Sequence, residues 1–397
     1  MTTRSLRRAL GAALLALAAG APAAAQLPFS FTVREAATQP GAPALQSFAI
    51  GQADGLWLLV GGRRNGFHRT SDRESTFPSA WANDSLYVVD VARGRTWSAP
   101  LPPQYRMLLR VNNMQHAQEG NTLYVVGGYG SSCDTDDRTC YQTYPNLTAI
   151  DVPAVIRGVQ ARDAGAIAAG IVTVQDERMR VTGGGLKMIG DMFYLVFGQN
   201  YDSIYKGGYT GKYTEQVRSF HIANVGGVVQ IQNYRAYSDP GGGGPASQWH
   251  RRDLNVVETV YADGNPGIAV YGGVFTPNGG AWLNPMYIAS GAGSASITLD
   301  PQFAMRMSPY ECAQVLMYDP GSRTMYTTLL GGITFWYYDP AGRLVQSSVD
   351  NWMPWTAAIT TLARAPNGAT REVVQPATMQ MPQRMGGNAV FVPAGNL

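Results

Sequence analysis

The densest group of side chains that could do chemistry lies at residues 249–253, which read Trp-His-Arg-Arg-Asp. His250 could exchange a proton, Arg251 or Arg252 could hold an anion, and Asp253 could orient either group. A structural role explains the same residues. Arg252 and Asp253 could form a buried ion pair between neighbouring units, with His250 as a loop residue.

A second carboxylate, Glu311, opens a later apolar run between Tyr310 and Cys312. Glu311 and Asp253 are the carboxylates that stand at the start of such runs. If the chain is an enzyme, they are the paired acid and base candidates, together with His250. A hydrogen bond between two units is the alternative role for Glu311.

A basic cluster follows the first apolar run and contains Arg63, Arg64 and His68. These arginines could bind carbonyl groups of a neighbouring unit. Combined with the arginines near residue 250, they would instead suit a carboxylate-bearing or anionic ligand. Other polar residues that border apolar runs are candidate ligand-binding positions as well: Asn113, Tyr129, Gln199, Arg251, Arg252 and Tyr310.

The sequence does not support several common kinds of catalytic or metal site. The four histidines are not at metal-ligand spacing, and no Gly-x-Ser-x-Gly motif is present, which argues against a zinc or copper site and against a serine hydrolase. The sequence therefore predicts no metal and no cofactor.

The elements that must position these residues centre on an apolar run that ends in a glycine pair. It reads Gly-Leu-Trp-Leu-Leu-Val-Gly-Gly at residues 55–62 and returns at 121–128, 267–273 and 326–332, with a degenerate copy at 191–198. Such short apolar runs bounded by turn residues predict buried strands, and their recurrence predicts an array of similar units.

Each unit predicts four strands, which in the first unit lie at residues 44–50, 56–60, 84–91 and 95–101. Four-stranded antiparallel units of this length are typical of β-propeller blades. The glycine pair, the Leu-Tyr-Val-Val-Asp strand at 86–90 and Trp97 resemble a kelch repeat. The match is good at residues 55–97, fair in the second unit and degenerate in the later three.

The resemblance implies an all-β fold, a kelch-type β-propeller that occupies residues 26–397 as one domain. Related propellers serve as oxidases, sugar epimerases, glutaminyl cyclases and binding platforms, so the fold does not select a function. The tyrosine-cysteine copper site of the kelch-type oxidases has no recognisable counterpart here.

The number of blades depends on how the termini are used. Five units are clear, and strands near residues 29–33 and 388–392 are left over. Pairing of the first and last strands would close the ring and remove exposed edges. We therefore expect six blades, the sixth built from both termini, with five blades as the alternative.

The first 25 residues predict a cleaved signal peptide, with Arg4, Arg7 and Arg8 before a short apolar run and an alanine-rich cleavage site. We expect a secreted or periplasmic protein. In that compartment Cys133 and Cys140, which flank a polar loop, predict a disulfide. Cys312 is expected to be a buried free thiol.

Residues 26–397 carry 27 basic and 27 acidic side chains. This balance argues against nucleic acid or an anionic membrane as a partner. We also expect a monomer without a membrane span. The sequence favours a ligand- or protein-binding module, with a glycan, a carboxylated small molecule, a peptide or a protein bound at the channel mouth. The alternatives are a periplasmic enzyme resembling sugar epimerases and mutarotases, using Asp253, Glu311, His250 and the arginines, and an assembly role through the long loops.

Overall fold

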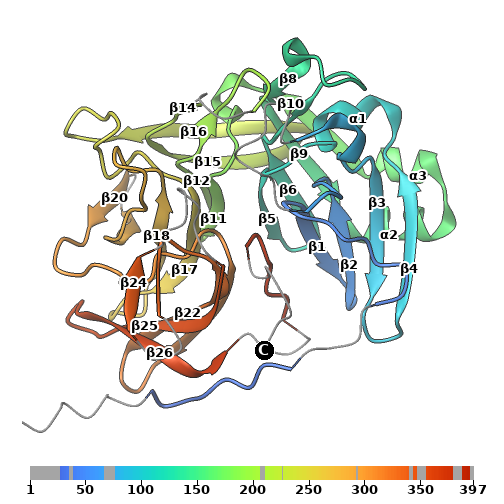
Figure 1. Ribbon diagram of the computed structural model, residues 1–397. Coiled ribbons are helices and arrows are strands. Elements are labelled where there is room, and N and C mark those ends of the chain that lie inside the picture. The colour runs from blue at the N-terminus through green and yellow to red at the C-terminus, as the bar shows by residue number, and fades with distance from the viewer. Residues whose placement is uncertain are drawn as a thin grey trace, which may run out of the picture.

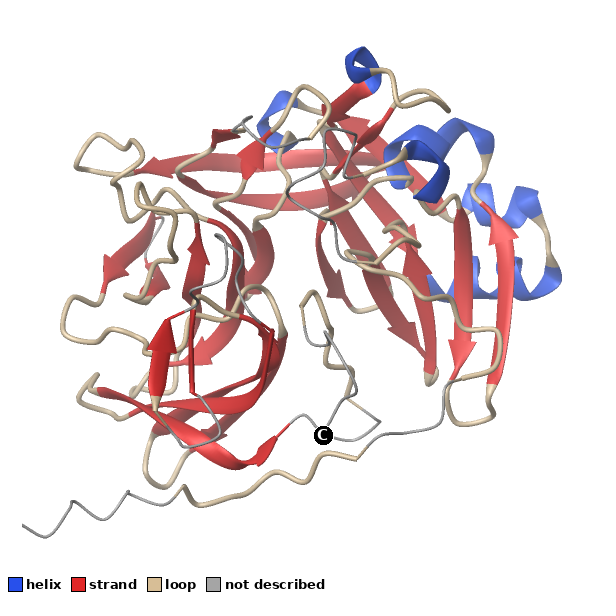
Figure 2. Ribbon diagram, in the orientation of Figure 1, coloured by secondary structure: helices blue, strands red, loops and turns tan. Residues whose placement is uncertain are grey.

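The five apolar runs form the second strands of five four-stranded antiparallel sheets, which are the blades of a β-propeller (Figures 1 and 2). The structure is a computed structural model. It describes residues 27–34, 39–66, 77–205, 211–225, 227–291, 294–338, 343–346, 355–378 and 387–393. The signal-peptide prediction lies outside these residues.

In every blade, the four strands lie side by side in chain order, from the innermost strand to the outermost one. Blade 1 holds β1 (Ala49–Ala53), β2 (Leu56–Val60), β3 (Ser85–Asp90) and β4 (Arg95–Pro100), and blade 2 holds β5 (Gln115–Glu119), β6 (Thr122–Val126), β9 (Asn146–Asp151) and β10 (Ile171–Gln175). Blade 3 holds β11 (Gly185–Ile189), β12 (Met192–Val196), β15 (Gln216–Val225) and β16 (Val228–Ser238). Blade 4 holds β17 (Arg252–Val260), β18 (Pro266–Val274), β19 (Met286–Gly291) and β20 (Ser294–Leu299), and blade 5 holds β21 (Ala313–Asp319), β22 (Thr324–Ile333), β25 (Trp355–Arg364) and β26 (Thr370–Thr378).

Smaller elements decorate the blades. Three short hairpins pair β7 (Tyr129–Ser131) with β8 (Tyr141–Thr143), β13 (Gln199–Asn200) with β14 (Lys212–Tyr213), and β23 (Trp336–Tyr338) with β24 (Leu344–Gln346). The helices are α1 (Pro103–Leu109), α2 (Val152–Ala161) and α3 (Ala164–Ala169), gathered beside blades 1 and 2 (Figure 2). Within the described part of the chain, no helix is long and apolar enough to cross a membrane.

The glycine that ends the apolar run brings blades 1, 2 and 3 close to the blade that follows each of them. The backbone N–H of Gly128 donates to the Val181 carbonyl at 2.9 Å, and Gly62 and Gly198 make the same bond to Val111 and Arg251. Gly127 has φ +63°, and a Cβ there would lie 2.0 Å from the Val181 oxygen. The pair therefore supplies a left-handed turn and a close backbone approach that a side chain would prevent.

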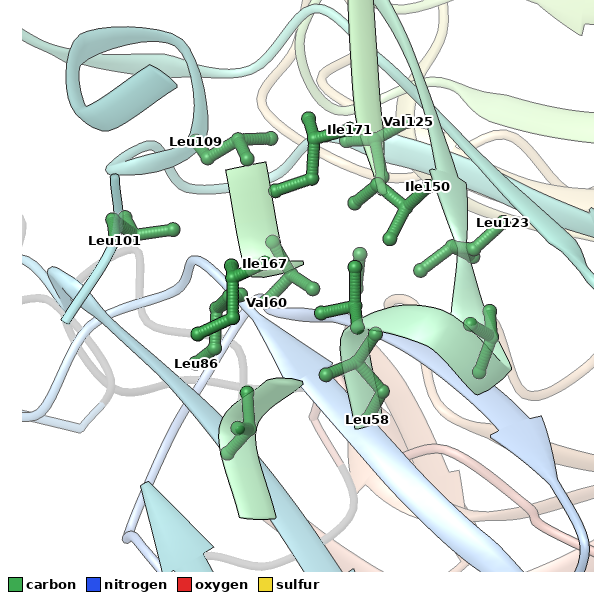
Figure 3. Packing of buried hydrophobic residues seen from close by; sticks show 14 of the residues in the cluster. Leu58, Val60, Leu86, Leu101, Leu109, Leu123, Val125, Ile150, Ile167 and Ile171 are labelled. Carbon is green, nitrogen blue, oxygen red and sulfur yellow. The ribbon is translucent and has the colours of Figure 1, made fainter. Parts of the chain in front are cut away.

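Hydrophobic side chains fill the space between the blades. The cluster in Figure 3 joins Leu58 and Leu86 of blade 1 to Leu123 and Ile150 of blade 2. The buried face of α2 completes this cluster with Val152, Val155, Ile156 and Val159. The repeat pattern did not predict α2, although Asp151 caps it by accepting a hydrogen bond from the Ala154 N–H.

One backbone hydrogen bond per blade links the segments that precede the innermost strands. Along the chain, Asn113 donates to Ser47, Gly183 to Asn113, Asp253 to Gly183, Glu311 to Asp253 and Asn388 to Glu311, over 2.7–3.4 Å. We call these six residues the ring residues. Five of them introduce blades, and the sixth, Asn388, belongs to the C-terminal segment between blade 5 and blade 1 (Figure 1).

The described residues form five blades, which is the alternative that the sequence left open, and the expected sixth blade is not among them. Residues 27–33 form no strand. Instead Leu27 and Phe29 pack on Tyr326 of blade 5, where they cover apolar surface. The C-terminal segment contributes an isolated bridge between Gly387 and Cys312 and the ring residue Asn388. The termini thus occupy the place of a sixth blade without its sheet.

The predicted disulfide between Cys133 and Cys140 is confirmed, and Cys312 is a buried free cysteine. The bridged loop carries Asp134, whose carboxylate accepts from Arg110 Nη1 at 2.6 Å, and Asp136, which accepts from the Ser79 N–H at 2.6 Å. Because Ser79 belongs to blade 1 and Arg110 leads into blade 2, the loop fastens one blade to the other.

We predict that Gly127→Ala destabilises the protein by at least about 3 kcal/mol, because the new Cβ collides with the Val181 carbonyl. Gly120→Ala is a matched control, since Gly120 has φ +53° and no other atom lies within 4 Å of the position that its Cβ would take. It should cost only the left-handed penalty of about 1 kcal/mol. Urea denaturation measures both, and equal losses would contradict the close-approach explanation.

We predict that Cys133→Ser/Cys140→Ser lowers the free energy of unfolding by about 2 kcal/mol, since the short loop loses its cross-link. Alkylation and intact mass should find one free thiol in the unreduced wild type, at Cys312. Cys312→Ala keeps the bridge and is the control for cysteine removal. A double variant as stable as the wild type would show that the loop is held by its ion pairs alone.

Candidate functional site

The residues before the innermost strands and after the glycine pairs meet at one end of the channel. They surround a cavity of about 30 Å³, which we call the mouth cavity. Its lining residues are Phe77, Asn112, Asn113, Tyr129, Thr182, Gly183, Gln199, Tyr201, Tyr205, Asp253 and Tyr310. The predicted positions Asn113, Tyr129, Gln199, Asp253 and Tyr310 therefore lie together.

A buried ion pair stands at this cavity. Arg252 Nε lies 3.3 Å from Asp253 Oδ2, and both side chains are at most 10% exposed. Arg252 also donates to Gln199 Oε1 and to the Tyr205 hydroxyl. Burial raises the pKa of Asp253, although Arg252 and a hydrogen bond from Tyr310 act in the opposite direction. Arg252 and Asp253 thus form an ion pair within blade 4, not between neighbouring units, and Asp253 also borders a cavity.

Asp253 sits in a strained conformation. Its φ is +52°, in the left-handed region that a non-glycine residue seldom adopts. The conformation lets the Asp253 N–H reach the Gly183 carbonyl at 2.7 Å while its side chain borders the mouth cavity. The ring bond therefore fixes the direction of the carboxylate.

Arg63 is the second buried cation near the mouth, with 2% of its surface exposed. Its guanidinium lies 4.5 Å from the centre of the Phe77 ring. Nε donates to the Gly66 carbonyl and Nη2 to Gln46 Oε1, but Nη1 has no hydrogen-bond partner among the described residues. Burial lowers the pKa of Arg63 to about 10, so it stays charged at neutral pH.

A line of hydrogen bonds leads from Arg63 to Glu311. Gln46 accepts from Arg63 and donates Nε2 to Asn388 Oδ1 at 3.2 Å, and Asn388 Nδ2 donates to Glu311 Oε2 at 2.9 Å. Burial, with the nearby Asp253 carboxylate, raises the pKa of Glu311 to about 8. The Glu311 side chain therefore bonds to the C-terminal segment, where the sequence allowed a bond between two units.

Glu311 and Asp253 do not border a common cavity in the described structure. Asp253 borders the mouth cavity, whereas Glu311 borders two cavities further along the channel, of about 30 and 120 Å³. We call these the ring cavity and the channel cavity. His116 lines both, and burial lowers its pKa to about 4. The paired acid and base arrangement expected for an enzyme is not present at the mouth.

Other predicted site residues lie away from the mouth cavity. The His250 ring stacks on Tyr213, and its Nδ1 lies 2.6 Å from Glu215 Oε1. Arg251 is fully buried and donates to carbonyls of Gly272 and Asn284, which holds the loops of blade 4. Arg64 is exposed and donates to the Ala80 carbonyl. His68 lies outside the described residues.

Tyr201 and Tyr205, in the loop that follows Gln199, also line the mouth cavity, and sequence reasoning did not place Tyr205 there. The Tyr129 hydroxyl ties this loop down by donating to the Ser203 carbonyl at 2.6 Å and accepting from the Tyr205 N–H at 2.8 Å. Tyr129 is thus committed to the loop, and the tyrosine-rich composition was the only available signal.

Comparisons with known proteins assign no family to the chain. No protein-family model matches it, and a search of curated proteins finds no match. Within the described residues, no group of three or more His, Cys, Asp or Glu side chains could hold a metal ion.

We predict that Asp253→Asn costs about 3–5 kcal/mol of stability, because it leaves buried Arg252 without its carboxylate. Asparagine tolerates the left-handed conformation, so the backbone contributes little to this loss. Arg252→Met in the Asp253→Asn background should restore part of the stability. A double-mutant cycle by urea denaturation measures the coupling, and strictly additive losses would show that the two charges do not depend on each other.

Proposed function

We propose that the chain is an exported, kelch-type propeller that binds a small molecule or peptide through a carboxylate group at the mouth cavity. The β-propeller fold is compatible with a binding module. The kelch assignment draws support from the repeats at residues 55–97 and 121–128, and export from the pattern of the first 25 residues. The disulfide is compatible with an oxidising compartment.

The observation that carries this proposal is that Nη1 of Arg63 has no hydrogen-bond partner among the described residues. A buried donor without a partner costs free energy, and a charged donor costs more. In the described part of the mouth, Arg63 and Arg252 outnumber the single carboxylate of Asp253, which leaves an excess positive charge. A ligand carboxylate would supply both the missing acceptor and the missing charge.

The size of the mouth cavity favours a carboxylate over a glycan. Its volume of about 30 Å³ suits a group the size of one or two water molecules. A sugar ring needs a larger pocket, as small-molecule sites usually span a few hundred Å³. The epimerase alternative also needs a proton-exchanging pair facing one cavity, and Asp253 and Glu311 border different ones.

Thermal melting with a panel of ligands tests the proposal. We expect succinate, pyruvate and peptides with a free C-terminus to raise the Tm, and the matching amides to leave it unchanged. Arg63→Met should weaken the binding of the best carboxylate by at least about thirtyfold. Arg64→Met is the matched control, because it removes an exposed neighbouring arginine and should bind normally.

Two outcomes would overturn the proposal. One is stabilisation by neutral sugars without any response to carboxylates, which would point to a glycan. The other is equal weakening by Arg63→Met and Arg64→Met, which would reduce the effect to general surface charge. Circular dichroism of each unliganded variant separates loss of binding from loss of fold.

A further inference from the structure

A larger cavity lies between the outer parts of blades 3 and 4 (upper left of Figure 1). Strands β12, β15 and β16 of blade 3 form one side, and β19 and β20 of blade 4 form the other. We call this cavity the blade groove. It shares no lining residue with the mouth cavity. Its volume of about 330 Å³ reaches the size of small-molecule sites, about 300–1,000 Å³.

The groove is a break in the hydrophobic packing between the two blades. Nearer the centre of blade 4, Met286 and Ile288 of β19 pack against blade 3. Because strand residues alternate between faces, Ser290 is the next residue of β19 on that side. Its short side chain leaves space opposite Tyr194 and Tyr237.

The lining of the groove is polar. Nine of its eleven lining residues carry a polar side-chain group, six of these are hydroxyl groups of serine or tyrosine, and no carboxylate lines it in the described part of the chain. An apolar ligand would find little surface to cover here. A ligand rich in hydroxyl groups would find both donors and acceptors.

A β-bulge directs Asn233 toward this groove. The pairing of β15 with β16 shifts between Ser219 and His221. Opposite this shift Asn233 has φ +51°, in the left-handed region. Its Nδ2 lies 3.2 Å from His221 Nδ1, and both residues line the groove. Bulges are over-represented beside functional sites because they redirect a side chain, and strained residues gather there too.

Two planar polar groups at the groove are available to a ligand. Asn233 Oδ1 makes no hydrogen bond to the described residues, and Arg235 makes neither a hydrogen bond nor an ion pair with them. An amide and a guanidinium each present adjacent polar atoms, which suit two neighbouring hydroxyl groups of a sugar ring. The Tyr237 hydroxyl accepts from the Ala295 N–H at 2.9 Å, and this bond fixes the spacing of the two blades.

We propose that the blade groove binds one pyranose ring of a neutral sugar. Asn233 and Arg235 bond to neighbouring hydroxyl groups of the sugar, and Met192 with the ring of Tyr237 covers its apolar C–H face. The sugar is uncharged because Arg235 is exposed, and a single exposed charge contributes little to binding. This site is separate from the carboxylate site proposed at the mouth cavity, and neither needs the other to be occupied.

An NMR titration of the full chain with the methyl glycosides of glucose, galactose and mannose tests the groove. We expect saturation transfer from the protein to at least one of them, with a Kd of about 1–10 mM, since one small ligand in an open site gains few contacts. In the Arg63→Met background, methyl glucuronide should bind no more tightly than methyl glucoside.

Three variants assign the binding to the groove. Ser290→Trp fills the space and should abolish glycoside binding. Ser296→Trp is the matched control, because Ser296 is an exposed serine of the adjacent strand β20 that does not line the groove. Asn233→Gly accepts the left-handed backbone but removes the amide, so it should weaken binding about fivefold. Arg63→Met should leave glycoside binding unchanged, which separates the groove from the mouth.

The proposal fails if none of the three glycosides binds at about 50 mM, or if Ser290→Trp binds them as well as Ser296→Trp does. It also fails if Arg63→Met removes glycoside binding, which would place the sugar at the mouth. Tighter binding of methyl glucuronide than of methyl glucoside to Arg63→Met would show that the groove selects an acid. Should Ser290→Trp not fold by circular dichroism, an unchanged affinity of Asn233→Gly would overturn the proposal.

Discussion

The short backbone contact that the glycines after the second strands of blades 1, 2 and 3 make with the next blade is the constraint on which the propeller depends. Gly62 and Gly128 donate to the following blade, and the glycine before each of them has no room for a side chain. This contact sets how closely two blades approach, and it thereby sets where the ring residues meet. The hydrophobic clusters supply most of the stabilisation, but a non-directional force does not choose this spacing.

Arginines at nearly the same position in the chain have different roles. Some hold loops together, and others lie beside the mouth cavity. Arg251 and Arg252 are adjacent, yet Arg251 points between loops and satisfies carbonyls, while Arg252 faces the axis beside Asp253. Arg63 donates a hydrogen bond from Nη2 to Gln46, but its Nη1 has no partner among the described residues. This propeller thus uses arginine both to fasten loops and to place buried charge beside the residues that line the mouth cavity.

The sequence predicted the parts of this arrangement that repeat. The recurring glycine pairs indicated the all-β propeller and placed Arg63, Asp253 and Glu311 near the axis. The pattern could not separate Arg251 from Arg252, because the start of β17 falls between these two adjacent residues. The pattern also did not show that Asn388 would join the ring residues, because a single residue that makes one backbone bond leaves no repeat in the sequence. For the same reason it favoured six blades over five. α2 lies between two strands of blade 2 and has no counterpart in the other blades, so the repeat pattern could not predict it.

Asn388 has a consequence for the order in which the protein is built. It bonds to Gln46, which lies 342 residues earlier, so this contact closes a very long loop. A chain that is synthesised from its N-terminus can pair the strands of each blade locally as they emerge. The seam between the last blade and the first must wait for the final segment. The contacts of Asn388 with Gln46 and Glu311 can therefore form only after the rest of the ring has been synthesised.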